Sequence, residues 1–187
     1  MASKYSILEC IAKAPLARVS LVSEISGAPW MTGRKVDPPA EVVAYKVHKD
    51  RPGNLRALYS NLAVPLIRDD LLKVIKDVGV DNMQDFDAVL RDPVKDAEHT
   101  NYRALNILGM VAAADLGKST FMHSQSLTGV DRDFDKLEFK DKLRTDLLLF
   151  RLAESSNALV VHEKVKKAIE KSKIEGVVFY DSGEWSG

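Results

Sequence analysis

Four consecutive residues, Gly117-Lys118-Ser119-Thr120, match the end of a phosphate-binding loop, in which backbone amides and a lysine hold the phosphates of a nucleotide. The complete motif also requires a glycine five residues before the second glycine, so that the backbone can wrap around the phosphates. Ala112 stands at that position, in a stretch rich in alanine. The sequence therefore does not predict a nucleotide-binding site here.

Three aspartates at alternate positions, Asp131, Asp133 and Asp135, have the spacing of the first three ligands of a calcium-binding loop. The rest of that motif is absent, because lysines stand where the loop requires a glycine at position six and a glutamate at position twelve. With Glu138, the aspartates instead form a local negative patch. The pattern favours a solvated acidic loop that can meet a basic partner over a calcium site.

Few other residues could act as nucleophiles or metal ligands. The single cysteine, Cys10, excludes an intrachain disulfide and a cysteine-based zinc site, and it indicates a reducing compartment. It lies in an apolar run without a basic neighbour, so we interpret it as a core residue of a strand. The four histidines lack the spacing of metal ligands. The sequence predicts no catalytic residue, no metal site and no cofactor.

Most of the secondary structure predicted from the sequence consists of strands. Alternating or continuous apolar runs predict strands over 5–11, 17–22, 41–48, 86–90, 147–152, 158–161 and 177–180. A loop rich in glycine and proline surrounds Trp30. The polar segments 92–100 and 117–135 are predicted to be irregular, and 102–114 fits a helix or a strand equally well.

Two amphipathic helices are predicted from apolar residues at helical spacing. The first spans 70–78, and the second follows the strand 158–161 and carries Val165 and Ile169 on one face. The segments 64–90 and 159–180 share one plan, which is an apolar run, a short charged helix, a glycine and a strand. This similarity raises the hypothesis of an internal duplication.

Length and composition are those of an ordinary globular protein. The 187 residues suffice for one domain with a substantial core, and 45% of them are hydrophobic. The 27 basic and 27 acidic residues give no net charge, whereas a nucleic-acid-binding protein usually has a basic excess. No apolar run is long enough to cross a membrane, and the N-terminus does not fit a signal peptide. We expect a cytoplasmic protein without nucleic-acid or membrane partners.

Several short segments in the second half carry a resemblance to a known family. They are 101–109, 114–119, 149–152, 159–168 and 174–179, with the helix over 65–78 upstream. This pattern resembles the bacterial immunity proteins of polymorphic toxin systems, a family typified by a myxobacterial member. The similarity covers roughly residues 60–181. It implies a cytoplasmic protein that binds and neutralises a cognate toxin in competition between bacteria, and it brings no catalytic residues with it.

These observations together predict an α+β fold, in which a few amphipathic helices pack on a mixed sheet. We expect a single immunity-protein-like domain over 1–187, with a β-rich N-terminal part (1–55) and a family-like region (60–181). The predicted function is stoichiometric toxin inhibition, with Asp131, Asp133, Asp135 and Glu138 in the contact. The alternatives are an enzyme with an unrecognised active-site pocket and a small-ligand-binding regulatory module.

Overall fold

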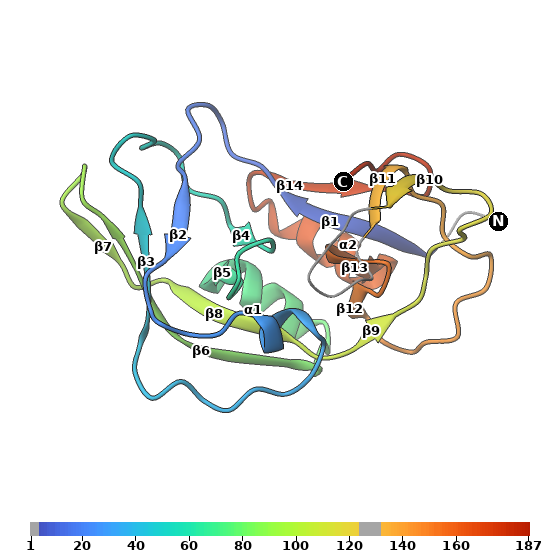
Figure 1. The fold of residues 1–187 in the computed structure, drawn as a ribbon, viewed down its shortest axis with the longest axis horizontal. Coiled ribbons are helices and arrows are strands. Elements are labelled where there is room, and N and C mark those ends of the chain that lie inside the picture. Colours follow the sequence, from blue (N-terminus) through green and yellow to red (C-terminus); the bar gives the residue numbers. More distant parts are fainter. Residues whose placement is uncertain (1–3, 124–131) are drawn as a thin grey trace.

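The computed structural model describes residues 4–123 and 132–187, and it folds them mainly into strands (Figure 1). A five-stranded sheet has the order β14-β1-β13-β12-β9. Its neighbours are antiparallel except for β12 and β9, which are parallel. The strands are β1 (Tyr5–Cys10), β9 (Met110–Val111), β12 (Leu149–Leu152), β13 (Ser155–His162) and β14 (Val177–Tyr180).

A seven-stranded sheet contains most of the first half of the chain. Its order is β2-β3-β6-β8-β5-β4, and β7 pairs with β6 at one end. Only β3 and β6 are parallel neighbours. The strands are β2 (Val19–Leu21), β3 (Val43–Val47), β4 (Leu58–Tyr59), β5 (Leu66–Arg68), β6 (Met83–Asp92), β7 (Ala97–His99) and β8 (Tyr102–Ile107).

Two α-helices occur where the sequence predicts them, α1 (Asp69–Asp77) and α2 (Glu163–Ser172). They contact each other near the middle of the molecule (Figure 1). The buried residues of α1 and α2 join one core cluster with residues from both sheets, including Leu8, Ile67 and Leu105. The helices therefore bind the two sheets together through apolar burial.

The segments 64–90 and 159–180, which have the same order of predicted elements, form two similar units. In β5-α1-β6 and in β13-α2-β14, a strand from elsewhere lies between the two strands of the unit. The inserted strands, β8 and β1, are antiparallel to both of their neighbours, so the two strands of each unit run parallel. Each unit is thus a split β-α-β motif, with Gly79 or Gly176 at positive φ between helix and strand.

Both faces of the five-stranded sheet are buried. One face joins the helices, and the other packs against a second cluster that includes Ile7, Phe134, Phe150 and Trp185. Phe134 and Trp185 belong to segments that cover the sheet from outside. These are β11 (Arg132–Lys136), which pairs with β10 (Thr120–His123), and the C-terminal residues.

The structure confirms the α+β class, corrects two details and decides one question that the sequence left open. The strands divide between two sheets and a hairpin, whereas the sequence analysis expected one mixed sheet. The segment 102–114, left open between helix and strand, contains β8 and β9. The segment 92–100, expected to be irregular, contains β7. Among the described residues, no helix has the length and apolarity needed to span a membrane.

Candidate functional site

The acidic stretch that sequence analysis singled out forms a β-hairpin from strands β10 and β11. Phe121 lies opposite Phe134 with ring centroids 5.6 Å apart, and Phe134 lies 6.2 Å from the ring of Trp185. On the other edge of β11, Phe134 exchanges backbone hydrogen bonds of 2.7 and 2.9 Å with Gly187. The prediction of an irregular loop is therefore wrong for residues 120–123 and 132–135, because their aromatic residues anchor the hairpin to the core.

The outer face of this hairpin carries two of the four predicted contact residues. Asp133 and Asp135 flank the buried Phe134, so both point away from the core, and both are exposed. Within the described part of the chain, neither carboxylate forms an ion pair. Met122 lies opposite Asp133 and is 65% exposed. We call Met122, Asp133 and Asp135 the hairpin face.

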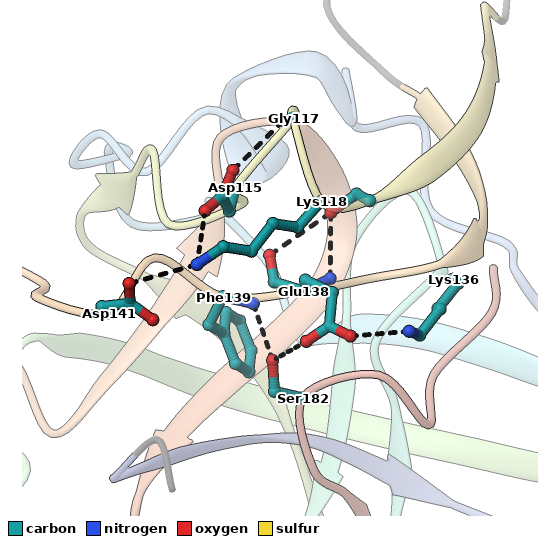
Figure 2. Close-up of polar contacts among 9 residues, drawn as sticks. Asp115, Gly117, Lys118, Lys136, Glu138, Phe139, Asp141 and Ser182 are labelled. Carbon is teal, nitrogen blue, oxygen red and sulfur yellow. Dashed lines mark hydrogen bonds and ion pairs between the residues drawn. The ribbon is translucent and has the colours of Figure 1, made fainter. Parts of the chain in front are cut away.

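The other two predicted contact residues do not join the hairpin face. Glu138 accepts a hydrogen bond of 2.8 Å from Ser182 Oγ and forms an ion pair of 2.8 Å with Lys136 Nζ (Figure 2). These two donors, Lys136 first, lower the pKa of Glu138. Its charge is thus already engaged within the protein. Asp131 lies outside the described residues.

The stretch that resembles a phosphate-binding loop is also engaged in internal contacts. Lys118 Nζ lies 3.1 Å from Asp141 and 3.2 Å from Asp115, and these carboxylates raise the pKa of the lysine (Figure 2). Ser119 Oγ accepts a hydrogen bond from the backbone of Glu138. Strand β10 follows, in place of the helix that a phosphate-binding loop requires. The lysine therefore ties the hairpin base to the body of the protein.

A cavity of about 270 Å³ opens beside the hairpin, and Asp133 is part of its wall. Segments far apart in the sequence build it, so we call it the Asp133 pocket. Its polar lining comes chiefly from Glu9 on β1, Arg56 and Asn61 beside β4, Asp133 on β11, Asn157 on β13 and Trp185 near the C-terminus. Sequence reasoning missed Glu9, Arg56, Asn61 and Asn157, because no local motif connects them.

Charges in the Asp133 pocket are incompletely matched. Trp185 Nε1 donates a hydrogen bond of 2.6 Å to Glu9 Oε1, which fixes the indole beside the cavity. Among the described residues, Arg56 forms no ion pair and its buried Nε has no hydrogen-bond partner. Cys10 also lines the cavity, and burial raises the pKa of its thiol to about 12. The thiol therefore stays protonated at neutral pH and is a poor nucleophile.

The structure also shows where Trp30 lies and whether the described side chains could hold a metal ion. Trp30, in the glycine- and proline-rich loop, is 2% exposed and packs edge-on against Phe86 at 5.4 Å, so it belongs to the core. Residues 4–123 and 132–187 contain no group of three or more histidine, cysteine or acidic side chains arranged to hold a metal ion.

A protein-family model matches most of the chain. The model of the immunity protein family Imm11 matches residues 27–184 of the 187. The chain belongs to the Imm11 immunity protein family. The match begins well before residue 60, so it includes the loop of Trp30 and strand β3 as well as the hairpin. No curated protein matches the chain in sequence.

Membership in the Imm11 family gives the chain a general role. Immunity proteins neutralise toxins, so the partner of an Imm11 member is a toxin, whose identity the family does not specify. Immunity proteins are typically not enzymes. The hairpin face and the Asp133 pocket both lie within or beside the matched region. They combine an exposed methionine, a residue type enriched in protein–protein interfaces, with a pocket that can bury an anchoring side chain of a partner.

Proposed function

We propose that this Imm11 protein neutralises one cognate bacterial toxin by forming a stoichiometric complex with it. The observation that carries the proposal is the family match over residues 27–184. The protein acts in the cytoplasm of the toxin-producing cell, as part of a polymorphic toxin system used in competition between bacteria. It binds the toxin directly and has no catalytic role in the protection.

The hairpin face supplies part of the toxin contact in this proposal. Met122 offers an adaptable apolar side chain, and methionine is enriched in protein interfaces. Asp133 and Asp135 carry exposed charges that attract a basic surface, which many toxins that act on nucleic acids present at their active sites. The buried Phe134 and Trp185 and the partly buried Phe121 lie behind this face and hold it in place before the toxin arrives.

Co-expression with the toxin encoded by the neighbouring gene tests the function. Growth should be rescued, and the two proteins should co-purify in equal amounts. Protection without a detectable complex would overturn the proposal, as would protection by far less protein than toxin.

Association kinetics test the contact. Replacing Asp131, Asp133 and Asp135 together by Asn should slow association with the toxin and weaken its dependence on salt, because the charges that steer the encounter are lost. An unchanged association rate in a variant with wild-type stability would place the contact elsewhere, with the exposed side of α2 as the next region to test.

A further inference from the structure

Resting on the proposed function, we propose that the Asp133 pocket receives one arginine side chain of the toxin. The hairpin face supplies the rim of the contact, and the pocket supplies its anchor. This assignment gives different roles to two aspartates on one strand, because Asp133 lines the cavity and Asp135 does not.

The charge of the pocket favours a cation with one positive charge. Glu9 and Asp133 contribute two carboxylates, and Arg56 contributes one guanidinium, so the side chains of the lining have one negative charge in excess. Among the described residues, these three groups form no ion pair with one another. A guanidinium from the toxin balances the charge and supplies donors to carboxylates that have free acceptor positions.

The shape and lining of the pocket favour arginine over lysine. The hydrogen bond from Trp185 Nε1 fixes the carboxylate of Glu9 in the wall, while the indole itself is buried. The planar guanidinium of arginine can pair with a carboxylate through two donors at once, whereas lysine offers a single ammonium group. The carboxamides of Asn61 and Asn157 add acceptors and donors for the backbone of the incoming segment. Arginine is also one of the residues that most often dominate binding energy at interfaces.

The test compares Asp133→Asn with Asp135→Asn in the full chain. Both substitutions remove one exposed charge from the same face of β11, so both should slow association to a similar, small extent. Only Asp133→Asn removes a carboxylate from the pocket. We expect it to raise the dissociation rate of the toxin's catalytic domain at least about ten-fold, against less than about three-fold for Asp135→Asn. Surface plasmon resonance at two salt concentrations separates the two rates.

A double-mutant cycle identifies the side chain that enters the pocket. Each arginine of the toxin's binding surface is replaced by Gln and combined with Asp133→Asn, and one of these pairs should show strong coupling in dissociation rate. Equal dissociation rates for the two aspartate variants, or coupling to no arginine, would overturn the pocket assignment while the complex itself persists. Absence of a complex with the wild-type chain would instead overturn the proposed function.

Discussion

Arg151 on β12 allows a quantitative test of how this fold tolerates an unpaired charge in its interior. Its side chain is fully buried, and among the described residues it forms no ion pair. Nη1 donates a hydrogen bond of 2.6 Å to the carbonyl of Ser156, whereas Nε and Nη2 have no partner. Buried charges are normally paired, so this guanidinium should destabilise the folded state.

The size of the penalty follows from the pKa of Arg151, which burial lowers to about 10. At about 1.4 kcal/mol per pKa unit, this lowering corresponds to a cost of roughly 3 kcal/mol for the charged form. Replacing Arg151 by Met keeps much of the apolar stem and removes the charge, at the loss of a hydrogen bond worth about 1 to 1.5 kcal/mol. Arg151→Met should therefore raise the free energy of unfolding by about 1–2 kcal/mol.

Urea unfolding followed by tryptophan fluorescence measures the change in stability. Arg144→Met is the matched control, because Arg144 is exposed and its replacement should alter the free energy of unfolding by less than about 0.5 kcal/mol. A fall of more than about 1 kcal/mol for Arg151→Met, with Arg144→Met neutral, would refute the reasoning. It would show that the guanidinium stabilises the fold.

Three further outcomes are expected. Phe134→Ala should lower the free energy of unfolding by about 3–5 kcal/mol in urea titration, because Phe134 is buried under the hairpin, whereas Met122→Ala should change it by less than about 0.5 kcal/mol. The thiol of Cys10 should react with a disulfide reagent at pH 8 only after unfolding, because burial raises its pKa to about 12, and rapid labelling of the folded protein would contradict this. Asp181 accepts hydrogen bonds from Ser6 and Lys166, and these lower its pKa in the folded protein. The carboxylate therefore stabilises the fold at pH values above the ordinary pKa of aspartate, and this stabilisation is lost as the pH falls through the lower pKa of the folded state. Asp181→Asn should consequently be less stable than wild type at pH 7, and the difference should shrink below about pH 4, as measured by urea unfolding at both pH values.

Local periodicity was sufficient to predict both helices and seven of the fourteen strands of the described residues. Leu71, Leu72 and Ile75 recur at helical spacing and are buried in α1, and Val165 and Ile169 do the same in α2. The same approach failed for β8, because this strand is buried on both faces. Tyr102 and Ala104 face one core cluster, while Leu105 joins another, so the strand lacks the alternation of polar and apolar residues that identifies a half-buried strand.

The hairpin and the pocket were harder to predict, for different reasons. In β11, the alternation of Asp133, Phe134 and Asp135 is that of a strand, but it is short and surrounded by charges, so the stretch resembles a loop. The Asp133 pocket exists only after folding, because Glu9 and Asp133 come to line one cavity through the packing of β11 and the C-terminal segment over the five-stranded sheet. A single sequence carries no signal that connects such distant residues.

The central claim is that this Imm11 protein inhibits its toxin by direct one-to-one binding. Isothermal titration calorimetry of the purified chain against the neighbour-encoded toxin, with residual toxin activity assayed at each point, tests this claim most directly. The account predicts a single binding step with a stoichiometry near one, and loss of toxin activity in proportion to the complex formed. No binding heat with full protection, or complete inhibition at a small fraction of one equivalent, would contradict it.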